Sequence, residues 1–166
     1  MSSNITIIGS GLTGPLLAIL LAEQGYAVDL YEKRLDPRQE RLSAGRSINL
    51  ALSYRGIKAL KSAGVFDQVE PQLIPMKGRM IHREYGELDF QPYSINPNEY
   101  INSVSRGELN KILMTSAENT GMVNIHFDHT LIEVTHNELI FSSGGTIPNE
   151  GIILGQMVQD QNCENI

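Results

Sequence analysis

Residues 4–14, with the sequence NITIIGSGLTG, decide the fold of the first part of the chain. They join a β-branched run, Asn4–Ile8, to a Gly-x-Gly-x-x-Gly turn. A helical pattern then covers residues 12–24 and stops at Gly25, and a second apolar run covers residues 27–31. A strand, a tight turn, a helix and a second strand in this order predict a βαβ unit, whose strands are parallel and joined by a right-handed crossover.

The three glycines of this turn have separate roles in a dinucleotide-binding site. Gly9 permits the tight turn, Gly11 lets the backbone approach a pyrophosphate, and Gly14 lets the helix pack closely on the strand. The first turn of the helix then offers N–H groups and the positive end of its dipole to phosphate. Glu32 follows the second strand, where its carboxylate can accept hydrogen bonds from ribose hydroxyls. These four residues are therefore predicted to bind the ADP half of a dinucleotide.

The motif by itself leaves the dinucleotide open, because FAD and NAD share the ADP half. The negative charge of Glu32 disfavours the 2′-phosphate of NADP, although the neighbouring Lys33 and Arg34 weaken that objection. The alternative interpretation is a glycine-rich turn beside an unrelated surface glutamate. The strand, helix and acid in register make this alternative the weaker one.

Further along the chain, helical and strand patterns alternate. Residues 47–52 are an apolar run, and Ser53 is placed to cap a helix over residues 54–63 that ends at Gly64. Residues 76–90 have β character around a Tyr85-Gly86 turn, and residues 92–97 are predicted to form a loop.

The second half contains one long helix followed by short strands. Ser105 and Glu108 form a capping-box pattern for a helix that runs to about Asn119, with Leu109, Ile112, Leu113 and Ser116 on one face. Strands are predicted over residues 123–127, 131–135 and 139–142, with a tight turn at Asn137 between the last two.

Composition limits the class of protein. The chain has 166 residues, of which 41% are hydrophobic and 19% charged, as in an ordinary globular domain. A net charge of -6 opposes a broad nucleic-acid or anionic membrane surface. The single Cys163 cannot form an internal disulfide, which favours a cytoplasmic setting, and the apolar run at residues 16–22 is too short to span a bilayer.

Several longer strings resemble the kynurenine 3-monooxygenase family of class A flavoprotein hydroxylases. The similarity runs in order from about Ile5 to Leu154, and the resemblance implies a Rossmann-like α/β domain for FAD or NAD(P), with a parallel sheet and inserted β segments, in truncated form. The matching strings are Tyr31–Arg34 (YEKR), Gly45–Ser53 (GRSINLALS), Pro75-Met76, Arg79–His82 (RMIH), Ser103–Arg106 (SVSR) and Leu109–Lys111 (LNK).

The resemblance also implies roles for single residues. Those implied to contact FAD are Thr13, Tyr31, Glu32, Lys33, Arg34, Ala51, Arg106 and Leu131, and those implied to bind kynurenine are Arg79 and Tyr93. An arginine fork suits the α-carboxylate of kynurenine, and a tyrosine hydroxyl can add a directed hydrogen bond. The alternatives are a surface ion pair for Arg79, a loop aromatic packed on the core for Tyr93, and a salt bridge to Glu108 or another acid for Arg106.

The activity that the resemblance implies is the FAD- and NADPH-dependent hydroxylation of L-kynurenine to 3-hydroxykynurenine with oxygen, on the route from tryptophan to quinolinate and NAD. The cofactor supplies the difficult chemistry, so no side-chain nucleophile is expected. His126 and His129 flank Asp128, but a surface position is expected for them rather than a metal site. The alternatives are a non-catalytic dinucleotide-binding remnant, another flavin hydroxylase or an NAD-dependent reductase.

The last residues depart from the family pattern. After Ile152–Gly155 the family continues with Ala-Asp-Gly, whereas this chain continues with QMVQDQ from Gln156. If the Gly155 codon ends in G, the same bases taken one position earlier can spell Ala-Asp-Gly-Ala-Gly-Ser. We therefore expect residues 1–155 to be the FAD-binding domain, with the start of the substrate-binding β segments, and residues 156–166 to be an aberrant, frameshifted tail. Sequencing the gene tests this hypothesis.

Overall fold

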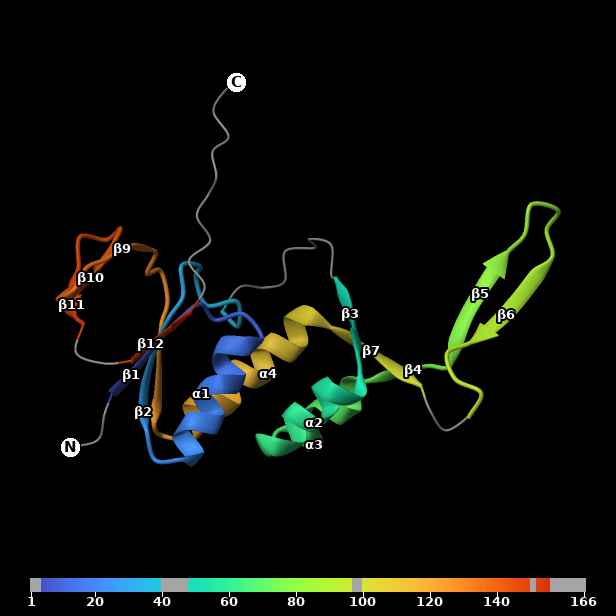
Figure 1. Cartoon of the computed structure of the whole chain (residues 1–166), viewed down its shortest axis with the longest axis horizontal. Coiled ribbons are helices and arrows are strands. Elements are labelled where there is room, and N and C mark those ends of the chain that lie inside the picture. The colour runs from blue at the N-terminus through green and yellow to red at the C-terminus, as the bar shows by residue number, and fades with distance from the viewer. Residues whose placement is uncertain (1–3, 40–47, 97–99, 150–151, 156–166) are drawn as a thin grey trace, which may run out of the picture. The chain divides into compact units, whose positions relative to one another are not determined.

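The computed structural model describes residues 4–39, 48–96, 100–149 and 152–155 (Figure 1). The chain forms two compact units, one made of residues 1–40 and 114–166 and the other of residues 41–113. The division falls within helix α4 (Arg106–Asn119), whose first half belongs to the second unit. Each unit has its own sheets.

The first unit is built on a four-stranded parallel sheet. Its strand order is β12-β1-β2-β8, from β1 (Asn4–Ile8), β2 (Ala27–Tyr31), β8 (Val123–His126) and β12 (Ile152–Gly155). All three neighbouring pairs are parallel. Helix α1 (Thr13–Glu23) connects β1 to β2 and packs on β2. The predicted βαβ unit and the α/β fold class are therefore confirmed.

Burial explains why this part of the sequence folds as it does. Ile5, Ile7, Val28 and Leu30 alternate along β1 and β2 and are each at most 2% exposed. Full burial of such a side chain contributes about 1.5–3 kcal/mol relative to exposure. Helix α1 ends where predicted, because Gly25 has a φ of +85°, in the left-handed region that glycine adopts readily.

Between β8 and β12 the chain forms a three-stranded antiparallel meander. It contains β9 (Leu131–Val134), β10 (Glu138–Phe141) and β11 (Thr146–Pro148), in the order β11-β10-β9. The predicted turn between β9 and β10 is present, since the N–H of Thr135 donates to Glu138 O at 2.8 Å. Leu139 and Phe141 pack with Tyr31 at the end of β2. This small core attaches the meander to the end of the parallel sheet.

The second unit contains a three-stranded antiparallel sheet. Its order is β3-β7-β4, formed by β3 (Asn49–Leu52), β7 (Ile101–Ser105) and β4 (Ile74–Met76). Helix α2 (Tyr54–Ser62), helix α3 (Phe66–Val69) and a 3₁₀ turn, η1 (Glu70–Gln72), connect β3 to β4. Ser53 occupies the N-cap position of α2 as predicted, but the predicted side-chain cap is wrong, because its side chain forms no cap hydrogen bond.

A two-stranded hairpin completes the second unit. Strand β5 (Gly78–His82) pairs antiparallel with β6 (Leu88–Pro92), and Gly86 lies in the turn with a φ of +84°. Pro92 ends β6 instead of opening the predicted loop. Within the described residues, these two strands form a sheet of their own, so they pair only with each other.

Helix α4 begins with half of the predicted capping box. Ser105 Oγ accepts a hydrogen bond from the N–H of Glu108 at 3.4 Å, but the carboxylate of Glu108 lies 3.1 Å from Lys111 Nζ instead. The predicted buried face is present, with Leu109, Leu113 and Ser116 all at most 7% exposed. Among the described residues, no helix is both long and apolar enough to span a membrane.

Candidate functional site

The glycine turn between β1 and α1 has a shape that depends on its glycines. Gly9 has a φ of +101°, and its N–H donates to Tyr31 O at 2.7 Å. A Cβ at Gly14 would lie 2.1 Å from the carbonyl oxygen of Gly9, so the helix and the turn are too close for any side chain there. A Cβ at Gly11 would meet no atom within 4 Å. The turn therefore combines a close helix contact at Gly14 with open space at Gly11, as the motif predicts.

The first turn of α1 has none of the usual side-chain caps. Leu12 occupies the N-cap position without a side-chain cap hydrogen bond, and the first turn contains no acidic residue. Thr13, the first helical residue, is exposed. The N–H groups at the start of a helix are ordinarily satisfied by a cap, by water or by a ligand. This helix start therefore suits a bound anion such as a pyrophosphate.

The Glu32 carboxylate connects β2 to the glycine turn. Glu32 is only 4% exposed, and its Oε2 accepts a hydrogen bond from the N–H of Ser10 at 2.7 Å. Its Oε1 accepts from the N–H of Arg34 at 3.0 Å and from Arg34 Nε at 2.7 Å. A carboxylate has about four acceptor positions, and the described residues use three of them, which leaves capacity for a ribose hydroxyl. The sequence offered no signal for Ser10, because its contribution is a backbone N–H.

These hydrogen bonds keep Glu32 charged. Burial alone raises the pKa of its carboxyl, but the hydrogen bonds from Arg34 and from the Ser10 N–H outweigh it and bring the pKa below its ordinary value. The side chain of Arg34 is 63% exposed, and Glu32 raises the pKa of its guanidinium. Lys33 is exposed. A fixed negative charge at the end of β2 suits a ribose with free hydroxyls better than one with a 2′-phosphate.

Tyr31 and two histidines form an aromatic cluster beside Glu32. The Tyr31 ring stacks on His126 with ring centres 4.6 Å apart, and His129 meets it edge-on at 5.6 Å. His126 Nε2 lies 2.8 Å from Asp29 Oδ1. Both histidines are partly exposed, in line with the expected surface position, and they also pack on Tyr31. Leu131, at the start of β9, packs against the core formed by Tyr31, Leu139 and Phe141.

Ala51 and Arg106 both belong to the second unit. Ala51 is exposed on β3 and pairs with Ser103 of β7. Arg106 is the first residue of α4, and its N–H donates to Ile48 O at 3.0 Å. No ion pair of Arg106 is found among the described residues, and Glu108 pairs with Lys111. The alternative of an Arg106–Glu108 salt bridge is therefore wrong.

Arg79 and Tyr93 share one face of the β5–β6 hairpin. Arg79 pairs with Gln91, and the N–H of Tyr93 donates to Lys77 O at 3.0 Å, which extends the ladder by one residue. Side chains two residues apart on a strand lie on the same face, and diagonal partners across a pair are within reach of long side chains. Both residues are exposed. The register thus brings the two predicted substrate ligands together.

The contacts of Arg79 leave its charge available. Its Nε and Nη2 donate to the neutral amide oxygen Oε1 of Gln91 at 3.0 and 2.8 Å. No carboxylate pairs with Arg79 among the described residues, so the alternative of a surface ion pair is not realised there. Tyr93 is 47% exposed, which contradicts the alternative of an aromatic buried in the core.

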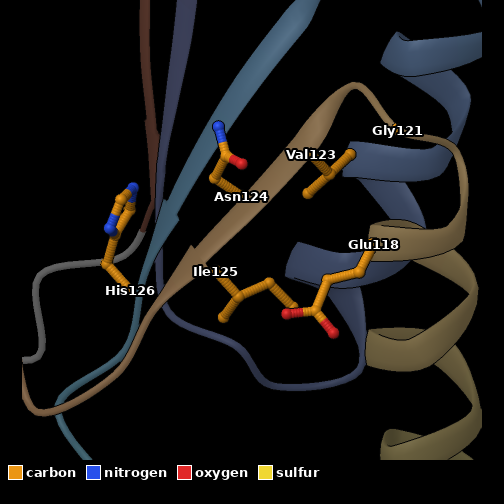
Figure 2. Close-up of a pocket in the computed structure, with 6 residues that line it drawn as sticks. All are labelled: Glu118, Gly121, Val123, Asn124, Ile125 and His126. Atoms are coloured by element: carbon orange, nitrogen blue, oxygen red, sulfur yellow. The ribbon is translucent and has the colours of Figure 1, made fainter.

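An open hollow of about 470 Å³ lies at the outer edge of β8 (Figure 2). Asn124 and His126 point to one side of the strand, while Val123 and Ile125 point toward the helices. Glu118 also lines it. None of the residues predicted to bind FAD or kynurenine contributes to this hollow, so the glycine turn remains the stronger candidate for a cofactor site.

Comparison with known proteins identifies the family of the chain. A family model described as "FAD binding domain" matches residues 2–140. A kynurenine 3-monooxygenase from Myxococcus xanthus is 48% identical over 130 residues, covering 78% of this chain and 28% of its own length. The enzyme of the same name from Cytophaga hutchinsonii is 44% identical over 163 residues, covering 93% of this chain and 36% of its own.

Solved structures show the same fold at lower sequence identity. The crystal structure of a Y270A variant of 2-methyl-3-hydroxypyridine-5-carboxylic acid oxygenase superposes with a TM-score of 0.71 at 18% identity, covering 89% of this chain and 38% of that one. This chain spans about a third of the length of the curated relatives that it matches. It belongs to the FAD-binding domain family, within which it is related to the kynurenine 3-monooxygenases and matches their N-terminal part.

Proposed function

We propose that this chain forms the FAD-binding part of an NADPH-dependent hydroxylase that converts L-kynurenine to 3-hydroxykynurenine, on the route from tryptophan to quinolinate and NAD. The observation that carries the proposal is the buried Glu32 carboxylate, hydrogen-bonded to the N–H of Ser10 in the glycine turn. It supports a ribose and a pyrophosphate held side by side. The two relatives named kynurenine 3-monooxygenase, 48% and 44% identical to this chain, support the proposed substrate.

The residues of the first unit would hold the ADP half of FAD. The N–H groups around Gly11 and Thr13 would bind a phosphate, since α1 has no side-chain cap, and Glu32 would accept a hydrogen bond from a ribose hydroxyl. Lys33 and Arg34 are both exposed and would add positive charge at this site. FAD, when bound, supplies the oxidation–reduction chemistry with NADPH and oxygen. The chain's own contribution at this site is binding and orientation.

The residues of the second unit would hold the substrate and more of the flavin. Arg79 carries a charge that no described carboxylate neutralises, so a kynurenine α-carboxylate can displace the neutral Gln91 amide from its guanidinium. Tyr93 on the same face can donate a hydrogen bond from its hydroxyl. Ala51 and Arg106 remain proposed FAD contacts, supported by the exposure of both residues.

Flavin binding by the purified 166-residue chain tests the cofactor assignment. We expect FAD to co-purify or to bind on addition, with a perturbed flavin absorbance spectrum, and ADP to compete with it. Glu32→Gln should weaken FAD binding by roughly tenfold, because one charged hydrogen-bond acceptor is lost. Glu133→Gln, on exposed strand β9, is the matched control and should leave it unchanged. A colourless wild-type protein that ignores ADP would contradict the proposal.

Calorimetric titration of the FAD-loaded chain with L-kynurenine tests the substrate assignment. Arg79→Ala should abolish detectable binding, while Arg83→Ala, in the turn of the same hairpin, should preserve it. NADPH oxidation that kynurenine stimulates would extend the proposal to turnover by this chain. Equal binding by wild type and Arg79→Ala would contradict the assigned role of Arg79. Turnover of a different aromatic substrate would favour another flavin hydroxylase.

Three expectations lie outside the described residues or remain predictions. The tail at residues 156–166, including Cys163, is not described, so its frameshift origin remains a hypothesis for gene sequencing. The boundary of the FAD-binding domain at residue 155 is likewise a prediction. We also propose a cytoplasmic location, supported by the single cysteine.

A further inference from the structure

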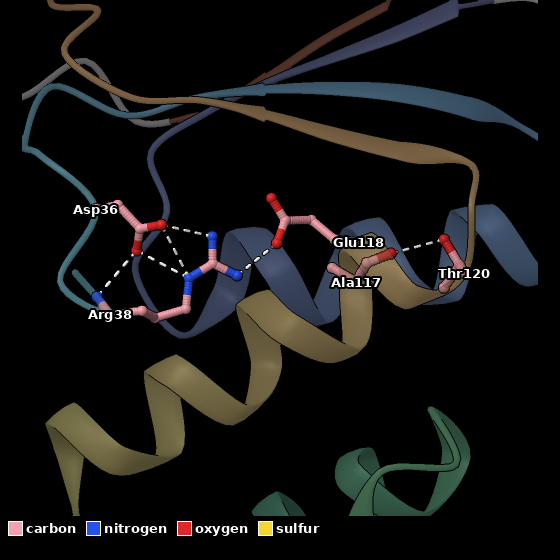
Figure 3. Close-up of polar contacts among 5 residues, drawn as sticks. All are labelled: Asp36, Arg38, Ala117, Glu118 and Thr120. Carbon is pink, nitrogen blue, oxygen red and sulfur yellow. Dashed lines mark hydrogen bonds and ion pairs between the residues drawn. The ribbon is translucent and has the colours of Figure 1, made fainter.

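Asp36 and Arg38, in the loop that follows Glu32, form an ion-pair cluster with Glu118 of α4 (Figure 3). Arg38 Nε donates to Asp36 Oδ1 and Arg38 Nη2 to Asp36 Oδ2, both at 2.8 Å, while Arg38 Nη1 pairs with Glu118 Oε2. The side chains of Arg38 and Asp36 are only 22% and 11% exposed. Shielding from water makes such pairs stronger than those on an open surface.

The cluster connects segments that are distant in sequence. Asp36 and Arg38 lie in the loop after β2, whereas Glu118 lies 80 residues from Arg38, in the last turn of α4. The Arg38 guanidinium also lies over the Phe127 ring, 5.6 Å from its centre, which adds a cation–π contact. Arg38 lowers the pKa of the Asp36 carboxyl, so this carboxylate stays charged. One arginine therefore holds the loop to the end of a helix and to the segment after β8.

The other end of the same loop carries the predicted ribose-binding residues. The N–H of His129 donates to Glu32 O at 2.9 Å, and the N–H of Asp128 donates to Arg34 O at 3.2 Å. Asp128 has a left-handed φ of 60°, which aspartate tolerates better than most residues. Beyond Arg34 the loop has little apolar anchoring, since Leu35 is 61% exposed. The Arg38 cluster is thus the main side-chain anchor of the far end of this loop.

We infer that Arg38 is a positioning residue for the adenosine end of the cofactor site, holding residues 33–39 in place so that Glu32 and Arg34 meet the ligand already ordered. The inference rests on the proposed function, in which Glu32 binds the ADP half of FAD. Each nitrogen of the Arg38 guanidinium already donates to Asp36 or Glu118, so we assign Arg38 a supporting role and no ligand contact. A ligand that must also order its loop binds more weakly than one that meets a preformed site.

Binding of ADP to the ligand-free 166-residue chain tests this inference. Titration calorimetry on Arg38→Ala should give a Kd for ADP roughly tenfold above that of wild type, as expected when loop ordering is added to binding. Arg38→Lys keeps the charge but loses the bidentate guanidinium, and its Kd for ADP should lie between those of wild type and Arg38→Ala. Arg83→Ala removes an arginine paired with a single carboxylate, Asp89, and should bind ADP like wild type.

A second readout separates positioning from general support of the fold. Hydrogen exchange of the backbone N–H groups of Arg34 and Arg38, measured without ligand, should accelerate in Arg38→Ala while that of the β1 and β2 N–H groups stays near wild type. A variant that merely destabilises the fold would accelerate both and leave the Kd of the folded fraction unchanged. If Arg38→Ala does not fold, Glu118→Gln replaces it with the same expectations.

The outcomes distinguish this inference from the function on which it rests. Wild-type chain that binds neither ADP nor FAD would overturn both. Wild-type binding with an unchanged ADP Kd in folded Arg38→Ala, or unchanged exchange at Arg34, would overturn only the positioning role. A raised Kd with local acceleration of exchange, partly rescued by lysine, would support it.

Discussion

The glycine turn in the first unit and the β5–β6 hairpin in the second both carry predicted ligand-binding residues, but they are held in different ways. Around the turn, Glu32 is 4% exposed and Leu30 is fully buried. On the hairpin, Tyr93 is 47% exposed and Leu88 is 62% exposed. The turn is fixed by the core of a four-stranded sheet, whereas the two strands of the hairpin pair only with each other in the part of the chain that the structure describes. Two-stranded hairpins are marginally stable by themselves.

Truncation of one leucine to alanine in each region should give the largest difference in the free energy of unfolding. Leu30→Ala leaves a cavity in the core of the parallel sheet and should lower the free energy of unfolding by about 2–5 kcal/mol. Leu88→Ala removes an exposed side chain and should change it by less than about 0.5 kcal/mol. Urea denaturation of both variants measures the difference. Similar losses would show that the face of the hairpin that carries Leu88 is buried in the folded chain.

Two glycines offer the same steric conflict in both regions. A Cβ added at Gly14 would lie 2.1 Å from the carbonyl oxygen of Gly9, and one added at Gly78 would lie 2.4 Å from the carbonyl oxygen of Gln91. Gly14→Ala should cost about 1–3 kcal/mol by overpacking and abolish ADP binding. Gly78→Ala should disturb the register of the hairpin and any kynurenine binding, while ADP affinity stays at the wild-type value. Loss of ADP binding in Gly78→Ala would contradict this expectation.

Acid should weaken the first unit through its paired carboxylates. Burial raises the pKa of Asp29, but hydrogen bonds from His126 and Asn4 outweigh it, and the pKa of Glu32 is lowered in the same manner. Their ordinary values are 3.8 and 4.5. Because the folded-state pKa values are lower, the stabilisation is complete above about pH 5 and is lost as the pH falls through them.

Urea midpoints measured from about pH 6 to about pH 3 test this dependence. We expect the midpoint to fall with acid in the wild-type chain, and Asp29→Asn to flatten part of the fall. An unchanged slope in Asp29→Asn would show that its pair with His126 does not contribute to stability.

The exposed ion pair of the hairpin should have the smallest effect. Arg83 Nη2 lies 2.9 Å from Asp89 Oδ2, with side chains 60% and 42% exposed. Arg83→Ala should change the free energy of unfolding by at most about 1 kcal/mol, and high salt should reduce even that. Urea denaturation at low and high salt measures it. A larger loss would mean that the hairpin depends on charge rather than on register.

Much of the fold followed from local patterns in the sequence. Strands β1 and β2 begin and end at the predicted residues, since their side chains alternate around a clear glycine turn. Strand β7 was missed, because its polar residues Asn102 and Ser103 hide a pattern in which alternate residues are buried. The position of Ser53 at the start of α2 was predicted correctly, but its side-chain cap hydrogen bond was not. The backbone sets the N-cap position, whereas the side-chain hydrogen bond depends on the surroundings.

The candidate site was predicted in part. The turn and Glu32 were found because the motif has a fixed spacing in one stretch of chain. The stacking of His126 and His129 on Tyr31 was not, because these residues meet only when β8 pairs with β2. The cluster of Arg38 with Glu118 was also invisible, since the two residues are 80 positions apart.

By itself, the sequence determined the βαβ unit, the glycine turn, the acid after β2 and the family to which the chain belongs. These depend on interactions between near neighbours and on strings that are specific to one family. Only the tertiary structure decided that Glu32 is bound to the Ser10 N–H, that Arg79 and Tyr93 share a face, and that Arg38 ties its loop to α4. Those facts depend on strand pairing and burial, which bring together residues that no local pattern connects.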